Sequence, residues 1–197
     1  SDVFEPGSTS KIMTVAAGLE EGTITPETPM ILPDSMERGD QTLSDSHPHP
    51  DEYRTVAGAL AESSNTGTML IGETMKPKTL EEYLRRFGLG STSGSGFPGE
   101  SGGLLPKSET WNGSQRYTIT YGQGVSTTAV QVTNVFQAIA NDGVRISPTF
   151  VKEVSDGEGG WEAAPAGKRN RAVSKKTAND VSRMLEGVVS DEGTAPE

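Results

Sequence analysis

Residues 9–20 form an apolar, alanine-rich stretch that predicts a helix, with Ser8 and Lys11 at its head. Side chains three residues apart are neighbours on a helix, so the hydroxyl and the amine would share the face of the first turn. A serine attacks only after a base removes its proton, and a lysine is such a base only where burial lowers its pKa. The free N–H groups and positive dipole end of a helix N-terminus favour an oxyanion and a neutral lysine. The pair is compatible with nucleophilic chemistry, although a capped helix with a solvated lysine is the better interpretation when the pair is taken alone.

A second polar motif, Ser63-Ser64-Asn65, falls between two helical patterns at residues 53–62 and 66–75. A turn between two helices can present the Ser63 hydroxyl and the Asn65 carboxamide together toward a cleft. Serine and asparagine are also the residues favoured at helix N-caps, so the triplet alone has a purely structural interpretation.

Together these motifs resemble the transpeptidase domain of class B penicillin-binding proteins. Residues 4–11 are similar to the family's Glu-Pro-Gly-Ser-x-x-Lys box, and residues 59–67 to its Ala-x-x-Ser-Ser-Asn-x-Gly box. Three further segments follow in the family's order and extend the resemblance over nearly the whole chain. Residues 83–90 resemble the family's helix that ends in Phe-Gly-x-Gly, Phe97-Pro98-Gly99-Glu100 resembles its Leu-Pro-Gly-Glu turn, and residues 121–131 resemble its Gly-x-Gly-x-Ser-x-Thr-x-x-Gln box.

The resemblance implies an α/β fold of the penicillin-binding-protein and serine β-lactamase type, with a helical subdomain and an antiparallel sheet. It implies a peptidoglycan D,D-transpeptidase that works through a serine ester without metal or cofactor and is trapped by penicillin. Ser8 would attack the carbonyl between the two terminal D-alanines of a stem peptide, Lys11 would take its proton, and Ser63 would relay it. The implied substrate-binding residues are Asn65, Thr66 and Gly124.

One motif of the family is absent. No Lys-Thr-Gly occurs, and Gly193-Thr194-Ala195 follows Glu192, whose carboxylate would repel the substrate carboxylate. In relatives a similar Gly-Thr-Ala lies upstream of the true motif, and strands of the central sheet precede the nucleophile. We therefore expect residues 1–197 to be a partial transpeptidase domain that lacks its N-terminal strands, its Lys-Thr-Gly region and much of its sheet.

The composition limits the partners. A net charge of −10 argues against nucleic-acid binding, and the absence of cysteine excludes disulfides and thiolate chemistry.

The resemblance implies stem peptides and β-lactams as ligands, membrane proteins of cell division as partners, and an extracytoplasmic domain held at the cell membrane by a single anchor outside this chain. A septal role is favoured over elongation. One basic cluster, residues 168–171 with Lys175 and Lys176, is interpreted as a solvated stretch.

Hydrophobic periodicity predicts the remaining elements. Helices are expected at residues 53–62, 66–75, 80–87, 129–140 and 177–189, in addition to 9–20. A loop is expected over residues 23–51, and a short strand over residues 118–121. Residues 150–154 and 171–173, on either side of a glycine-rich turn, are expected to be edge strands or a frayed hairpin.

His47 and His49 raise the question of a metal site. Pro48 and Pro50 hold this segment extended, and no third ligand has a defined spacing, so a pair of loop histidines is the better interpretation. The resemblance suggests instead that the segment packs beside the helix of the Ser-x-Asn motif.

Three alternative functions stay open at this point. A serine β-lactamase or D,D-carboxypeptidase uses the same motifs but passes the acyl group to water, and no glutamate here matches the water-positioning residue of class A lactamases. A β-lactam sensor binds the drug without turnover. A non-catalytic β-lactam-binding fragment is the third alternative, because a cleft that lacks one wall does not preorganise a transition state.

Overall fold

The computed structural model describes residues 2–191 and 193–196, so Glu192 lies outside the described residues. The α-helices are α1 (Lys11–Glu20), α2 (Val56–Ala61), α3 (Asn65–Glu73), α4 (Pro77–Arg86), α5 (Gln115–Thr118), α6 (Ala129–Ala140) and α7 (Lys175–Glu186). Single 3-10 turns are η1 (Gly7–Ser10), η2 (Ser108–Thr110), η3 (Ile119–Tyr121) and η4 (Gly187–Val189). The strands are β1 (Pro29–Leu32), β2 (Ser35–Arg38), β3 (Gln41–Ser44), β4 (Glu52–Thr55), β5 (Val144–Ile146), β6 (Glu153–Ser155), β7 (Trp161–Ala163) and β8 (Arg169–Arg171).

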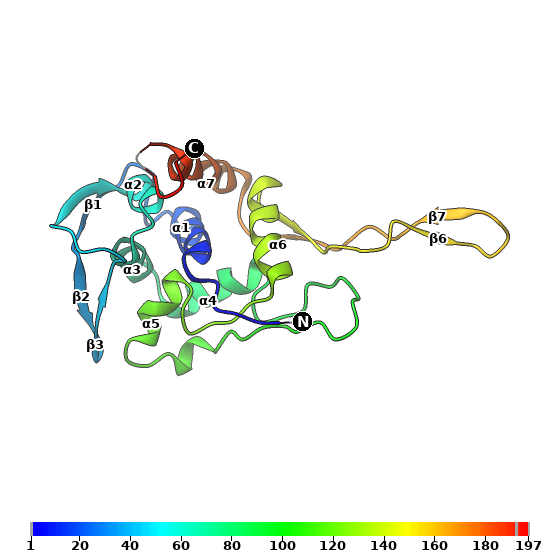
Figure 1. Cartoon of the computed structure of the whole chain (residues 1–197), viewed down its shortest axis with the longest axis horizontal. Helices are drawn as coiled ribbons and strands as arrows, with labels where there is room; N and C mark the ends of the chain where they lie inside the picture. Colours follow the sequence, from blue (N-terminus) through cyan, green and yellow to red (C-terminus); the bar gives the residue numbers. More distant parts are fainter. Residues whose placement is uncertain (1, 192, 197) are drawn as a thin grey trace.

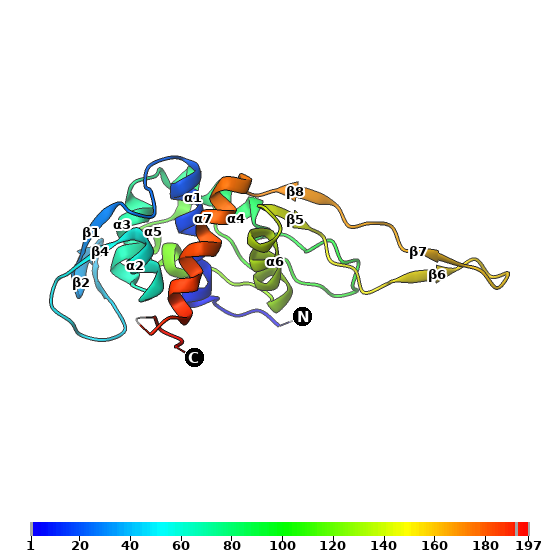
Figure 2. The ribbon, with the colours of Figure 1, turned by 90° about the horizontal axis from the view of Figure 1, so that it is seen from above.

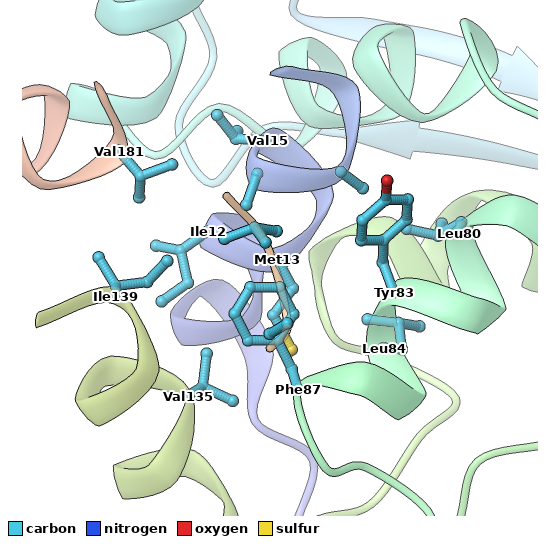
Figure 3. Packing of buried hydrophobic residues seen from close by; sticks show 14 of the residues in the cluster. Ile12, Met13, Val15, Leu80, Tyr83, Leu84, Phe87, Val135, Ile139 and Val181 are labelled. Carbon is cyan, nitrogen blue, oxygen red and sulfur yellow. The ribbon is translucent and has the colours of Figure 1, made fainter. Parts of the chain in front are cut away.

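Helix α1 is the centre of the fold. It contacts α2, α3, α4 and α7 (Figure 1). Every residue of α1 from Lys11 to Gly18 is buried. Figure 3 shows Ile12, Met13 and Val15 of α1 facing side chains of three other helices. A helix that is apolar on all sides requires such neighbours on all sides, and they position the lysine in its first turn. The surrounding side chains are Leu80, Tyr83, Leu84, Phe87, Val135, Ile139 and Val181.

Strands occur as antiparallel pairs, in agreement with the predicted combination of helices and antiparallel strands. Among the described residues, β1 pairs with β4, β2 with β3, β5 with β8, and β6 with β7, each as a two-stranded ladder. The β6–β7 hairpin extends away from the helical body, whereas β5 and β8 run back to it (Figure 2).

Five predicted helices besides the first were tested by the structure, and four are confirmed to within a few residues. These four are the helices expected at residues 66–75, 80–87, 129–140 and 177–189. The first helix, expected at residues 9–20, is confirmed as well. Local signals reinforce the periodicity. The Thr128 side chain and Gln131 form a reciprocal capping box at the start of α6, and Ser174 caps α7.

The loop predicted over residues 23–51 is wrong, because this segment contains β1, β2 and β3. Met36 and Leu43 are opposite each other in the β2–β3 hairpin, and both pack on Met69 of α3. Gly39, with φ of +63°, supplies the turn. The polar composition concealed these two buried positions, since the rest of the hairpin is mostly exposed.

Three other predicted elements differ from the structure in their bounds, type or pairing. The helix expected at 53–62 begins only at Val56, because Glu52–Thr55 pairs with β1. The strand expected at 118–121 is helical, and the carbonyl of Thr120 accepts a buried hydrogen bond from Thr14 at 2.7 Å. The segments expected at 150–154 and 171–173 do not pair with each other as a hairpin: β6 (Glu153–Ser155) pairs with Trp161–Ala163, whereas Arg169–Arg171 pairs with β5.

Candidate active site

Ser8 lies in η1, the turn that leads directly into α1. Its side chain is exposed, and the N–H of Lys11 donates to its carbonyl. Gly7 has φ of +54°, and its N–H donates to the carbonyl of Gly122 at 3.1 Å. Within residues 2–191 and 193–196 the Ser8 hydroxyl has no hydrogen-bond partner, Lys11 Nζ included. The hydroxyl is therefore presented to solvent from a turn held against a second loop.

Lys11 is 1% exposed, which is exceptional for a lysine. Its Nζ donates to the carbonyl oxygen of Ser63 and, at 3.0 Å, to the hydroxyl of Ser63. Burial lowers the pKa of Lys11 to about 8, while the negative charge of Asp45 acts in the opposite direction. The structure thus brings the amine of one sequence motif onto the first residue of the other, with a pKa near neutrality.

Ser63 is held in an unusual backbone conformation between α2 and α3. Its φ is +57°, in the left-handed region that a non-glycine residue rarely adopts. The next residue, Ser64, is buried and caps α3 by accepting from Gly67 N at 2.8 Å. Asn65 donates from Nδ2 to the carbonyl of Ser44 at 2.9 Å. The triplet is therefore both a helix cap and the turn that faces Lys11.

Asp45 holds this turn in place, a role that the sequence interpretation missed. Its carboxylate accepts from the Ser64 hydroxyl at 2.8 Å, from Thr66 N at 3.0 Å, and from Asn65 N. A carboxylate at the start of α3 also suits the positive end of the helix dipole. The only sequence signal is an aspartate in a polar segment, twenty residues before the helix that it caps.

The histidine segment packs against the same turn, as predicted. His49 Nε2 lies 3.2 Å from Asp45 Oδ2, and His49 Nδ1 lies 2.8 Å from the carbonyl of Pro50. A pocket of about 240 Å³ opens here, lined by His47, His49, Ser63 and neighbouring residues. In the part of the chain that the structure describes, no three of His, Asp and Glu are grouped as metal ligands.

Two expected substrate-binding residues lie in different settings. Thr66 is fully buried, with its hydroxyl between Asp45 and Ser64 at 3.2 and 3.1 Å, so it supports the turn from behind. Gly124 is half-buried, with φ of +75°, and donates to the Glu5 carboxylate at 2.8 Å. Substrate binding by either residue stays a prediction, and the position of Thr66 argues against direct contact.

The loop that carries Gly124 also supports the nucleophile. Gly122 has φ of +86°, and a Cβ there would lie 2.3 Å from both Gly7 O and Ser10 Oγ. Phe4 and Thr127 form an antiparallel bridge beside it. The chain around Ser8 is thus tied to residues 122–127 by backbone contacts that leave no room for a larger side chain.

Comparison with known proteins agrees with this geometry. The family model described as the penicillin binding protein transpeptidase domain matches residues 1–197. The chain is 38% identical to penicillin-binding protein PbpB of Mycobacterium tuberculosis over 202 residues, and 30% identical to the probable peptidoglycan D,D-transpeptidase PenA of Neisseria flavescens over 195 residues. These matches cover 100% and 98% of this chain but 30% and 45% of the two relatives.

Solved structures give the same result. The crystal structure of penicillin binding protein 3 from M. tuberculosis complexed with aztreonam superimposes with a TM-score of 0.93 at 39% identity, over 96% of this chain and 42% of that one. The transpeptidase domain of penicillin-binding protein 3 from Burkholderia pseudomallei superimposes with a TM-score of 0.87 at 34% identity, over 100% of this chain and 56% of that one. The chain belongs to the transpeptidase family of class B penicillin-binding proteins.

Proposed function

We propose that this chain contributes the nucleophile, the base and the proton relay of a peptidoglycan D,D-transpeptidase. The observation that carries the proposal is the environment of Lys11: a buried amine with a pKa of about 8, bonded to Ser63 and three residues after the exposed Ser8. The names of the relatives support it, since FtsI is called a peptidoglycan D,D-transpeptidase and PenA a probable one. The match covers 30% of PbpB and 24% of FtsI, so the activity of the whole protein is part of the proposal.

The first half-reaction forms a serine ester. A neutral lysine amine has two N–H groups and one lone pair; the two N–H groups would be used by the carbonyl and hydroxyl of Ser63, which leaves the lone pair for the Ser8 proton. Ser8 Oγ then bonds to the carbonyl carbon between the two terminal D-alanines. The amide C–N bond breaks, and the proton passes from Lys11 through the Ser63 hydroxyl to the leaving amine.

The second half-reaction reverses these proton movements. An amine of a neighbouring stem peptide gives up its proton through Ser63 to Lys11 while its nitrogen attacks the ester carbonyl. The new amide is the cross-link, and Ser8 is regenerated. The N–H of Ser8 lies in the first turn of a helix, where backbone donors lack partners within the helix, and it is suited to hold the oxyanion.

The substrate would lie beside the turn of Ser63. Asn65 is partly exposed next to this turn, and its side chain donates a hydrogen bond to the carbonyl of Ser44. The Asn65 carboxamide would form a hydrogen bond with the backbone of the stem peptide, either in place of the bond to Ser44 or in addition to it. Gly124 offers a backbone close to the Ser8 turn, where a side chain would obstruct the ligand. Thr66 would act indirectly by fixing Asp45.

Ligands and location follow from the same proposal. Stem peptides and β-lactams are the ligands, supported by the crystal structures of M. tuberculosis penicillin binding protein 3 complexed with aztreonam and with ampicillin. We also propose that residues 1–197 are part of a longer domain with the third motif, held outside the cytoplasm by a membrane anchor, and that it acts with division proteins at the septum. None of the helices in the described part of the chain is long and apolar enough to cross a membrane.

A turnover assay tests the function against its rivals. The full-length protein is incubated with a peptide ending in D-Ala-D-Ala and an excess of labelled D-amino acid, and the products are separated by mass. We expect the label to replace the terminal D-alanine, and Lys11→Ala to slow this at least ~100-fold, as for loss of a general base. Lys78→Ala, in the exposed face of α4, is the matched control and should retain the activity. Hydrolysis without exchange would overturn the transpeptidase assignment in favour of a carboxypeptidase or β-lactamase.

A further inference from the structure

An arginine-lined pocket lies away from the residues assigned to acyl transfer. It has a volume of about 540 Å³ and lies between the end of α4 and the paired strands β5 and β8. Figure 2 shows β5 and β8 at the root of the long β6–β7 hairpin. Four guanidinium groups in one pocket are unexpected in a chain of net charge −10. The lining residues are Glu82, Arg85, Arg86, Arg145, Asn170 and Arg171.

Two of these arginines are held by contacts on α4. Arg85 donates from Nε to the Glu81 carboxylate at 2.8 Å, and the same carboxylate accepts from Ser108 N. The guanidinium of Arg86 lies over the ring of Tyr83, 4.5 Å from its centroid. Their positions are therefore set before any ligand arrives, and Glu81 balances the charge of Arg85.

Arg171 is held in place by contacts that do not neutralise its positive charge. Its Nη1 donates to two backbone carbonyls, those of Asp142 at 3.0 Å and Val173 at 3.1 Å. Carbonyl groups fix a guanidinium but do not cancel its charge. No carboxylate of the described residues forms an ion pair with Arg171, and its other nitrogens are left for a ligand.

Arg145 is the least satisfied polar group in the described part of the chain. Its Nε is buried and has no hydrogen-bond partner, the single case among buried side-chain nitrogens and oxygens there. The guanidinium packs on Gly88, where a Cβ would come within 3.2 Å of Nη1. Arginine keeps its charge in a protein, so Arg145 contributes to the pocket a positive charge that no carboxylate of the described residues pairs with.

We propose that this pocket binds a phosphate monoester. Arg145 and Arg171 contribute two positive charges without a carboxylate partner, which matches the charge of nearly −2 on a phosphate monoester at neutral pH better than a carboxylate or a phosphodiester. The fork geometry of guanidinium suits phosphate oxygens, and the volume leaves room for the organic group that the phosphate carries. Glu82, exposed at the edge, disfavours the anion and limits its affinity.

The pocket joins residues that are scattered along the chain. Asn170 and Arg171 belong to the basic cluster that the sequence suggests is simply solvated, while the other three arginines come from residues 85, 86 and 145. None of them contributes to the acyl-transfer scheme. The inference therefore goes beyond the proposed function and does not depend on it, and Ser8→Ala should bind the phosphate ligand as the wild type does.

Calorimetric titration of the full-length protein with glycerol 3-phosphate tests the site. We expect saturable binding that weakens at least about tenfold in Arg145→Gln/Arg171→Gln, because two charge-assisted contacts are lost. Arg169→Gln removes the same charge from the same strand outside the pocket and should change the dissociation constant less than twofold. Absence of binding by the wild type at millimolar ligand, or an equal loss in Arg169→Gln, would overturn the proposal.

A second variant covers the case in which the double variant does not fold. Glu82→Gln alters an exposed side chain and should tighten binding about two- to fivefold by removing a repulsive charge; unchanged or weaker binding contradicts the site. Vesicles containing phosphatidic acid, with phosphatidylglycerol vesicles as control, distinguish the sources. Binding to phosphatidic acid that depends on Arg145 and Arg171 assigns a lipid monoester, whereas binding of glycerol 3-phosphate alone assigns a soluble one.

Discussion

Raising the pH from 7 to 9 should accelerate acylation of Ser8 by a β-lactam about tenfold, because Lys11 changes from mostly charged to mostly neutral over this range. With a pKa of about 8, roughly one Lys11 in ten is neutral at pH 7 and about nine in ten at pH 9. A lysine with its ordinary pKa of 10.5 would be neutral in only about 3 of 10,000 molecules at pH 7. Burial therefore increases the available base about 300-fold.

The assay is the second-order rate of labelling by a fluorescent penicillin between pH 6 and 9.5, corrected for spontaneous hydrolysis of the drug. We expect a slope of one below pH 8 and a plateau above it. Asp45→Asn should move the midpoint to lower pH, since the negative charge of Asp45 raises the pKa of Lys11. A rate that is flat from pH 7 to 9, or one that still rises with a slope of one at pH 9.5, would refute the assignment of Lys11 as a base activated by burial.

Three substitutions test the supports of the site, with urea unfolding and penicillin labelling as measurements. Asp45→Ala should lower the free energy of unfolding by at least about 3 kcal/mol, because several buried donors lose a charged acceptor, and a change below 1 kcal/mol would disprove its structural role. Ser63→Gly should leave stability unchanged or raise it by about 1 kcal/mol, since φ of +57° suits glycine, yet slow labelling at least about tenfold; unchanged labelling would remove its hydroxyl from the relay. Gly122→Ala should cost more than about 2 kcal/mol and slow labelling, because the new Cβ collides with Gly7, and normal stability would show that the loop adapts.

Elements with a strong local signal were predictable from sequence. Helix α6 combines an apolar face with a capping box, and its bounds agree with the prediction. The β2–β3 hairpin was not predictable from composition, because only Met36 and Leu43 are buried and their partner Met69 is far along the chain. The strand expected at residues 118–121 became helical where tertiary contacts outweighed the preference of β-branched residues.

The candidate site likewise contains residues that the sequence signals and residues that only the fold brings together. Ser8, Lys11 and Ser63 belong to short motifs whose spacing is readable, and the structure adds that Lys11 reaches Ser63. Asp45 has no such spacing, because it acts on a helix that starts twenty residues later. The arginine pocket is assembled from three separate segments, so its charges look like ordinary surface residues until the fold brings them together.

Intact-protein mass spectrometry with benzylpenicillin, followed by peptide mapping, tests the central claim most directly. The account predicts one drug adduct per molecule of the full-length protein, on the peptide that contains Ser8, and none in Ser8→Ala. Ser190→Ala, which removes an exposed hydroxyl elsewhere, should be labelled like the wild type. An adduct on another residue, or a labelled Ser8→Ala protein, would contradict the account.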